Sequence, residues 1–108
     1  MPSTGLVVIA CYRPRPGCEA ALLDVVEDHV PTLRRLGLAT ERPHVMMRAK
    51  DGTILEVFEW CSVDAVNRAH DHPDVQQLWS RFNDVCFYEP PANLEECKHL
   101  FPGFAPLN

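Results

Sequence analysis

The feature that most limits how this chain can fold is a continuously apolar run near its start, Leu6 to Tyr12, with the sequence LVVIACY. β-Branched residues in its middle favour a strand, and the lack of polar alternation predicts a strand covered on both faces. No basic region precedes the run, and it is far too short to cross a bilayer, so we expect neither a signal peptide nor a membrane helix. The fold must therefore supply cover for both sides of this strand.

The length and charge of the chain narrow its class. Its 108 residues, 46% of them hydrophobic, leave room for one domain with one modest core and for no separate cofactor domain. Fifteen acidic residues oppose ten basic ones, giving a net charge of -5, without a cluster of Lys and Arg. Because a nucleic-acid surface needs concentrated positive charge, nucleic acid is not an expected partner. We expect a cytoplasmic protein that acts as one unit over residues 1–108.

The five cysteines are scattered along the chain, and no two of them form a CxxC pair. An odd number without such spacing fits reduced thiols better than a disulfide framework or a structural zinc site. Cys11 lies within the first apolar run, where a buried thiol without a cationic neighbour keeps a high pKa and stays inert. The other four are Cys18, Cys61, Cys86 and Cys97.

Helical spacing of apolar residues follows the first strand and predicts a helix from Cys18 that ends at Gly37. Pro31 lies inside this helix and cannot donate a hydrogen bond to the carbonyl of Glu27, so we expect a kink or a break there. The core-facing stripe of this helix contains one histidine and consists of Leu22, Val25, Val26, His29, Leu33 and Leu36.

A β-hairpin is predicted over residues 43–60 (PHVMMRAKDGTILEVFEW), with Asp51-Gly52 as a two-residue turn. This register places Lys50 opposite Thr53 and His44 opposite Glu59. It also places Met46 with Leu55 and Val57 on one face, and on the other face Val45, Met47, Ile54, Phe58 and Trp60.

Two further helices follow the hairpin. Ser62 can cap the first of them, which continues to Asp71, and Pro73 then opens the second as its first residue. The second helix carries a stripe that should pack on the sheet, namely Val75, Leu78, Trp79, Phe82, Val85 and Cys86. Residues 89–108 are Pro-rich but still contain apolar side chains that need burial, so we expect a C-terminal arm there. These side chains are Leu94, Leu100, Phe101 and Phe104.

The resulting order, strand, helix, strand, strand, helix and a poorly defined last strand, predicts an α+β ferredoxin-like βαββαβ sheet. Its helices can cover only one face of the sheet, although both faces of the hairpin are apolar. A second copy of the same sheet is the simplest cover for the other face. We therefore expect a homodimer formed by sheet-to-sheet packing.

Within about residues 5–88, the string EVFEW, a following Ser-x-x-Ala start and AHDHPDVQQLWSRF resemble the antibiotic biosynthesis monooxygenase-like family of the dimeric α/β-barrel superfamily. The resemblance implies a dimeric α/β barrel with a small-molecule cavity between each sheet and its own helices. Members include monooxygenases that oxidise phenolic or anthrone-type polyketides without metal or flavin, haem-degrading enzymes, quinol oxidases, isomerases and proteins without an assigned activity. The fold alone therefore selects no reaction.

The residues of the haem-degrading branch do not match this sequence. That branch uses an Asn, a Trp and a His at positions that correspond here to Cys11, Ala69 and Trp79. The resemblance therefore does not support haem degradation, although His70 lies close enough to serve as a substitute ligand. A metal site built from His70, His72 and His44 or Cys61 is not expected either, because His-x-His across a helix end splays the two imidazoles.

Cofactor-free oxygenation needs a base, an apolar pocket and a donor for the developing anion. His70, at the end of a helix, is our first candidate base; its alternative role is to bind a helix-terminal carbonyl or to cap the next helix. His72, just before Pro73, is expected to be an N-cap or a solvated residue. His44 opposite Glu59 is the second candidate, and it depends on the hairpin register, because a shift of one residue separates the pair.

The remaining candidates are expected to shape a substrate pocket. His29, on the core-facing stripe, either points into a cavity or satisfies a carbonyl near Pro31. Of four aromatic residues we expect at most two to touch a ligand, because an aromatic stripe is usually core; these are Phe58, Trp60, Trp79 and Phe82. Cys11 completes the candidate substrate-binding set.

Two functions from different classes are consistent with the sequence. The first is a cofactor-independent monooxygenase or related small enzyme for an aromatic or quinonoid metabolite, without metal or other cofactor. The second is a non-catalytic barrel that binds a small ligand or serves as an oligomeric stress-response protein. A solvent-reachable cavity with a histidine on its wall would favour the first, and a fully packed interior would favour the second.

Overall fold

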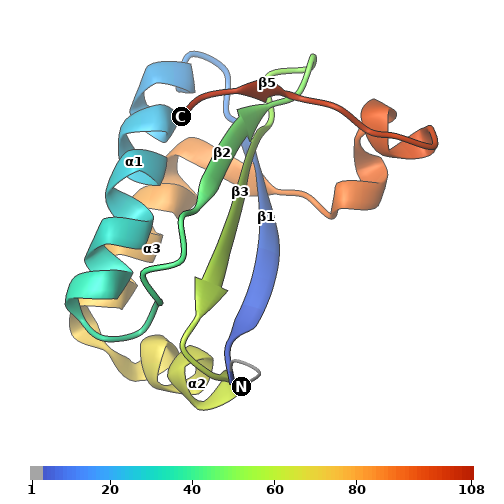
Figure 1. Cartoon of the computed structure of the whole chain (residues 1–108). Coiled ribbons are helices and arrows are strands. Elements are labelled where there is room, and N and C mark those ends of the chain that lie inside the picture. The colour runs from blue at the N-terminus through green and yellow to red at the C-terminus, as the bar shows by residue number, and fades with distance from the viewer. Residues whose placement is uncertain (1–3) are drawn as a thin grey trace.

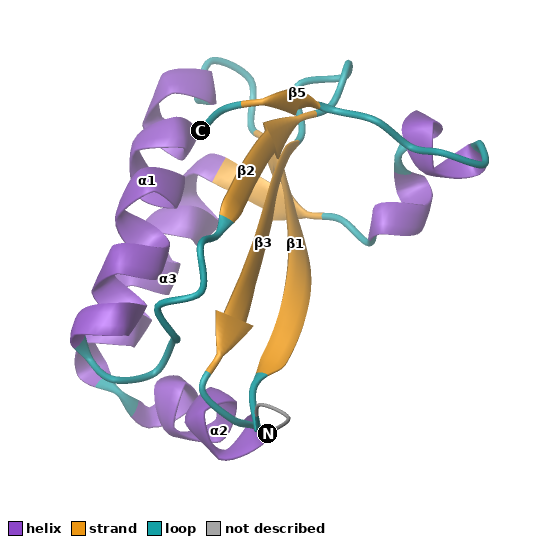
Figure 2. Cartoon of the chain, viewed as in Figure 1, coloured by secondary structure: helices purple, strands orange, loops and turns teal. Residues whose placement is uncertain are grey.

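A layer of helices packs on one face of a five-stranded antiparallel sheet in the computed structural model, which describes residues 4–108 (Figure 1). The strand order is β4-β1-β3-β2-β5. The predicted βαββαβ order is confirmed, with an extra edge strand from the arm (Figure 2). The elements are β1 (Leu6–Pro14), α1 (Glu19–Arg35), β2 (Val45–Arg48), β3 (Ile54–Trp60), α2 (Val63–Asp71), α3 (Pro73–Val85), β4 (Cys86–Tyr88), two short 3-10 turns (Pro91–Asn93 and Glu95–Lys98) and β5 (Ala105–Pro106).

The junction between α2 and α3 follows the local signals in the sequence. The Ser62 side chain accepts a hydrogen bond from the Ala65 N–H and caps α2. Pro73 is the first residue of α3, and His72 Nδ1 accepts a hydrogen bond from the Asp74 N–H at 3.2 Å. His72 is therefore the predicted N-cap, in an extended conformation that the following proline favours.

Of the kink or break expected at Pro31, the break is wrong, and the kink stays a prediction. Helix α1 continues through Pro31 to Arg35, one turn beyond the proline. Glu27, whose carbonyl loses its usual donor, lies on the exposed side of the helix, where water can replace that donor. The predicted end at Gly37 is confirmed to within two residues, because Gly37 has a positive φ of 74° and its N–H bonds to the carbonyl of Arg34.

The hairpin register also differs from the prediction. Ala49 pairs with Thr53 around a three-residue turn, and Gly52 adopts a φ of 94° while its N–H bonds to the Ala49 carbonyl. This is a type I turn followed by a left-handed residue, a common three-residue alternative to the two-residue turn. Val45 consequently lies opposite Val57, and Met46 lies opposite Glu56. The shift by one residue exchanges the two faces of β2 relative to β3.

Alternation along the strands separates two apolar surfaces. The face that meets the helices includes Tyr12, Ile54 and Phe58, which pack with side chains of α1, α2 and α3. The opposite face, here called the open face, carries no helix (Figure 1). It is formed by Val7, Ile9, Cys11, Val45, Met47, Leu55, Val57 and Glu59.

The arm (residues 89–108) crosses part of the open face and returns to the sheet. Leu94 is buried against Cys11 and Leu55, with Cys97 and Phe104 beside them, and β5 pairs with Met47 and Arg48 of β2. The expected burial of the arm is thus confirmed for Leu94 and in part for Phe104. It is wrong for Leu100 and Phe101, which are 89% and 90% exposed.

The five cysteines are free thiols, as predicted. Burial raises the pKa of Cys11 to about 11, with smaller contributions from Cys97 and Glu89. Within the described residues no helix combines the length and the hydropathy that a membrane span requires.

The turn at Gly52 generates a stability prediction. Gly52→Ala should lower the free energy of unfolding by about 1 kcal/mol, because a side chain at positive φ is strained although space is available there. Gly103→Ala is the matched control, since a Cβ at this position meets nothing within 4 Å. Urea denaturation of both variants measures the difference, and equal stabilities would contradict the turn geometry.

Candidate functional site

Three polar side chains meet in the interior between the sheet and the helices. His29 Nδ1 lies 2.7 Å from Glu56 Oε1, and the Tyr12 hydroxyl donates to the same oxygen at 2.9 Å. His29 comes from α1, Glu56 from β3 and Tyr12 from β1. Their exposed fractions are 4%, 0% and 4%. This buried set is here called the His29 site.

The pattern of the surrounding sequence places these groups inside. Glu56 lies between Ile54 and Phe58 on the face of β3 that meets the helices, so its carboxylate must enter the core. His29 lies on the buried stripe of α1. Burying a carboxylate without partners is strongly unfavourable, and the two donors offset part of this cost. One carboxylate oxygen, Glu56 Oε2, still has no hydrogen-bond partner among the described residues.

The positions of the protons decide which of Tyr12, His29 and Glu56 donates and which accepts. Burial, and then the charge and hydrogen bond of Glu56, raise the pKa of Tyr12 well above its ordinary value, so Tyr12 keeps its proton and donates it to Glu56. Glu56 Oε1 then acts as an acceptor toward His29 as well. An ionised Glu56 requires the proton of a neutral His29 on Nδ1, which makes Nε2 the basic atom. Within the described part of the chain, Nε2 has no hydrogen-bond partner.

A cavity of about 330 Å³ adjoins the His29 site. Its size lies at the lower end of the range for small-molecule pockets. The ring of Phe82 stacks on Tyr12 with centroids 4.6 Å apart and meets the edge of His29 at 5.0 Å. The cavity is lined by Tyr12, His29, Trp79, Phe82, Asn83 and Tyr88, which makes its wall mainly aromatic.

Asn83 and Tyr88 form the exposed, polar part of this wall. The Tyr88 hydroxyl donates to Asn83 Oδ1 at 2.9 Å, so the NH₂ group is the end of the amide that can donate to a ligand. Burial raises the pKa of Tyr88, which keeps it a donor. The Arg15 guanidinium also bonds to the backbone carbonyl of Asn83, which holds this turn of α3 in place.

The predicted pocket residues divide into two groups. His29, Trp79 and Phe82 line the cavity, so of the four aromatic candidates two reach it. Phe58 and Trp60 instead lie in the core beside α2, next to the cavity and not on its wall. Cys11 is on the open face, beneath the arm, because it alternates with Tyr12 along β1.

Of the predicted bases, His70 lies at the rim of the helical layer. Its side chain is exposed, and its ring meets Trp79 edge to face at 5.0 Å. Its carbonyl accepts a hydrogen bond from Gln76, which joins α2 to α3. His70 is therefore close to the cavity through Trp79, without lining it.

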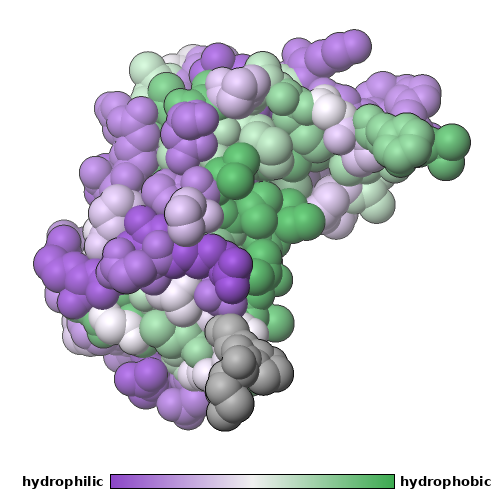
Figure 3. Space-filling view, in the orientation of Figure 1, coloured by the Kyte–Doolittle hydropathy of each residue, from purple (hydrophilic) through white to green (hydrophobic). Residues whose placement is uncertain are grey.

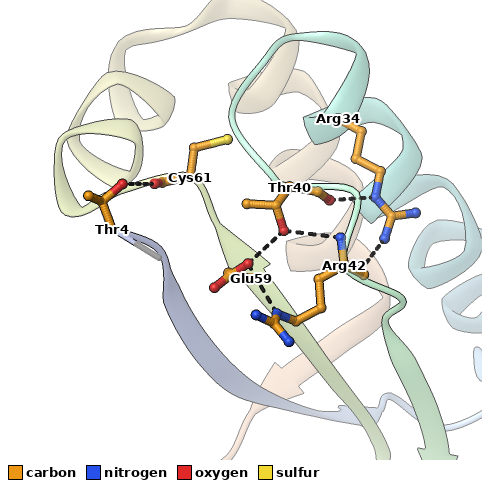
Figure 4. Close-up of polar contacts among 6 residues, drawn as sticks. All are labelled: Thr4, Arg34, Thr40, Arg42, Glu59 and Cys61. Atoms are coloured by element: carbon orange, nitrogen blue, oxygen red, sulfur yellow. Dashed lines mark hydrogen bonds and ion pairs between the residues drawn. The ribbon is translucent and has the colours of Figure 1, made fainter. Parts of the chain in front are cut away.

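The predicted pair of His44 and Glu59 is wrong, because the shifted register separates them. Glu59 Oε1 instead accepts hydrogen bonds from the Thr40 hydroxyl at 2.9 Å and from Arg42 Nε at 3.1 Å (Figure 4). Arg34 fastens the same loop through the carbonyls of Thr40 and Arg42. Glu59 thus ties residues 40–42 to the end of β3. Burial, followed by the charge of Arg34, lowers the pKa of His44.

Sequence reasoning missed Glu56, Tyr12 and Asn83. A signal for Glu56 exists in ILEVFEW, where a carboxylate stands between two apolar residues at alternate positions. The sequence did not show what Glu56 would meet, because its partners Tyr12 and His29 come from β1 and α1 and reach it only through tertiary packing. No local signal for Asn83 exists, since its position depends on how α3 and β4 meet at the cavity.

The residues considered for a metal do not come together. Within residues 4–108, no group of three His, Cys, Asp or Glu side chains has the arrangement of a metal site. His72 caps α3 and His70 packs against Trp79. The His29 site offers one imidazole and one carboxylate, which is a hydrogen-bonded pair suited to proton transfer.

Comparison with known proteins supports the fold. No profile of a known protein family and no curated protein matches the sequence. The structure is similar to SnoaB, a cofactor-independent oxygenase from Streptomyces nogalater, with a TM-score of 0.66 and 16% sequence identity. The match covers 81% of this chain and 88% of that chain. The ferredoxin-like α+β fold implied by the family resemblance is confirmed, while an identity this low does not assign a reaction.

The buried thiols and the buried Tyr12 hydroxyl predict how the stability of the fold depends on pH. Burial raises the pKa of Cys11 and Cys86 from 9.0 to about 11, and that of Tyr12 is raised as well. Above pH 9 the unfolded chain therefore loses protons that the folded chain retains, so stability should fall as pH rises. The midpoint of urea denaturation, determined under reducing conditions at pH 8, 9 and 10, measures this fall in stability. Cys11→Ala should flatten the decline, and a midpoint that rises with pH would contradict the assignment.

Proposed function

We propose that this protein is a small cofactor-independent monooxygenase, or a closely related enzyme, that acts on an aromatic or quinonoid metabolite in the cavity. The observation that carries the proposal is His29 on the wall of an aromatic cavity, with Nδ1 bonded to Glu56 and with a buried Nε2 that has no hydrogen-bond partner among the described residues. This arrangement favours a general base. Structural similarity to a cofactor-independent oxygenase is consistent with it.

The chemistry begins with proton removal. His29 Nε2 takes a proton from a phenol or from a carbon acid conjugated with a carbonyl, while Glu56 stabilises the imidazolium that forms. The substrate anion then supplies the electrons that reduce O₂. When a ring methylene becomes a carbonyl, one atom of O₂ enters the product. The other leaves as water with the two methylene hydrogens, so the reaction needs no further reductant.

The anion-stabilising donor in this proposal is Asn83, which lines the cavity. Its NH₂ end is left for a ligand by the bond from Tyr88 to its carbonyl oxygen. A donor at this wall stabilises negative charge that moves to the substrate oxygen when His29 removes a proton. Trp79 and Phe82 provide flat apolar walls for the ring system.

One observation favours the alternative, a barrel that binds a small ligand without catalysis. His29 is almost completely buried, so a ligand must fit closely to reach Nε2. The alternative would be supported if the protein binds a phenol, an anthrone or a hydroquinone but consumes no O₂ with any of them. Turnover would exclude it.

We also propose that the protein is a homodimer that associates through the open face. Val7, Ile9 and Val45 on this face are each about half exposed and are not covered by the arm. The space-filling view shows an apolar strip on the sheet next to the arm (Figure 3). Such contiguous apolar surface marks an interaction site more often than it persists in a monomer. The helices occupy the other face, so the cavity stays accessible in this dimer.

The assignment of the base is tested by substitution. His29→Gln should lower kcat for anthrone or hydroquinone oxidation by about 10²- to 10⁴-fold, because it removes the base. Glu56→Gln should lower it as well, since an amide donor at Nδ1 favours the wrong tautomer. Oxygen uptake after treatment with a chelator measures both. His70→Ala is the matched control, and a loss of turnover in that variant alone would make His70 the base.

The dimer is tested by mass in solution. Sedimentation at micromolar concentration should give twice the mass of one chain, and Ile9→Asp should shift the equilibrium toward the monomer. Dimer formation would remove water from the charged aspartate at this position, and this cost weakens association. A monomer at the same concentration for the unsubstituted chain would contradict the proposal.

A further inference from the structure

Two neighbouring apolar side chains at the end of the arm contact almost nothing in one copy of the chain. Leu100 and Phe101, here called the arm tip, are 89% and 90% exposed. The arm projects away from the sheet at this point (Figure 1), and apolar side chains gather at its end (Figure 3). An isolated exposed leucine would need no explanation, but two adjacent large residues form a patch.

The open face is divided into two halves with different cover. The half near the hairpin turn is covered by the arm, through Leu94, Cys97 and Phe104. The other half, here called the bare half, has no cover from the described residues and consists of Val7, Ile9, Val45 and the half-buried Val57.

Charge does not oppose association at the bare half. Glu59 belongs to the open face by alternation, yet it is only 6% exposed. Its carboxylate turns toward Thr40 and Arg42 at the end of the strand (Figure 4). The surface that remains is therefore apolar, and a second apolar surface can cover it without burying an unpaired charge.

The arm tip cannot cover the bare half of its own sheet. Leu94 is buried before the tip, and β5 is paired with β2 after it. The side chain of Asn108 extends this attachment through the Met46 N–H and the His44 carbonyl. Because the arm is fastened on both sides of the tip, the tip is available only to another molecule.

We propose that, in the homodimer, the arm tip of each copy covers the bare half of the partner's sheet. A two-fold axis that lies between the sheets and across the strands brings the covered half of one copy opposite the bare half of the other. A C2 interface is self-complementary, so the same contact forms twice. This inference rests on the homodimer proposed above and adds which residues meet within it.

The exposed apolar side chains are large enough to form the centre of an interface. The arm tip and the bare half contribute five large apolar side chains that are each at least 44% exposed. A standard interface buries about 800 Å² of each partner, so neighbouring backbone and polar side chains would complete it. The arm tip would then be the central apolar contact, the kind of position where single substitutions have large effects.

The test uses substitutions that a single copy tolerates. Because Leu100 and Phe101 are exposed, replacing both by Asp should leave the folded chain intact, as circular dichroism can verify. The dissociation constant of the dimer, measured by sedimentation over a dilution series, should rise by about tenfold to a hundredfold. Val63→Asp is the matched control, since Val63 is also exposed but lies on α2, and it should not change association.

Cross-linking identifies the contact itself. An Ile9→Cys chain mixed with a Phe101→Cys chain should give a cross-link between positions 9 and 101 of different chains with a short bismaleimide, identified by peptide mass spectrometry. Val63→Cys mixed with Phe101→Cys should not. If the chain dimerises but the arm-tip substitutions leave the dissociation constant unchanged, this inference is overturned and the homodimer stands. A monomeric protein would overturn both.

Discussion

The sheet is apolar on both faces, but the helices cover only one of them. The rest of this structure depends on that constraint. The helices bury Tyr12, Ile54 and Phe58 on one side, and the chain supplies only a short arm for the other. The cavity lies on the helical side, where aromatic residues of α3 meet the sheet. The bare half remains on the opposite side. The cavity and the exposed apolar surface thus lie on different faces of the same strands, and the alternation of side chains along each strand decides which face a residue belongs to.

The His29 site shows how a costly buried group can define chemistry. Glu56 has no access to solvent, and its placement in the core is tolerated because Tyr12 and His29 both bond to one of its oxygens. The same bonds orient the imidazole and assign its proton. A core of apolar residues of similar volume would often be as stable or more stable, so such a network points to a role beyond stability. Glu56 Oε2 and His29 Nε2, which have no hydrogen-bond partner within residues 4–108, are consistent with this interpretation, because each retains capacity to accept a hydrogen bond.

Local signals in the sequence predicted the local structure well. Ser62, His72 and Pro73 act through neighbouring backbone groups, and their roles as caps and helix start were predictable from short-range chemistry alone. The order of elements followed from periodicity. The hairpin register was not predictable in the same way, because Asp51-Gly52 fits both a two-residue turn and the end of a three-residue turn. That single ambiguity paired His44 with Glu59. Glu56 was missed for another reason, because its partners Tyr12 and His29 come from distant elements. Asn83 and Tyr88 were beyond reach, because they meet only through the packing of α3 against the edge strand.

Gly5 gives the open face its chemical character from outside the sheet. A Cβ at this position would lie 2.4 Å from Glu59 Oε2, so the carboxylate could not keep its place. A side chain at position 5 would therefore displace a carboxylate at the end of the sheet, opposite the half-exposed Val7. The absence of a side chain at position 5 thus lets Glu59 stay buried against Thr40 and Arg42, which leaves the neighbouring surface of the sheet apolar.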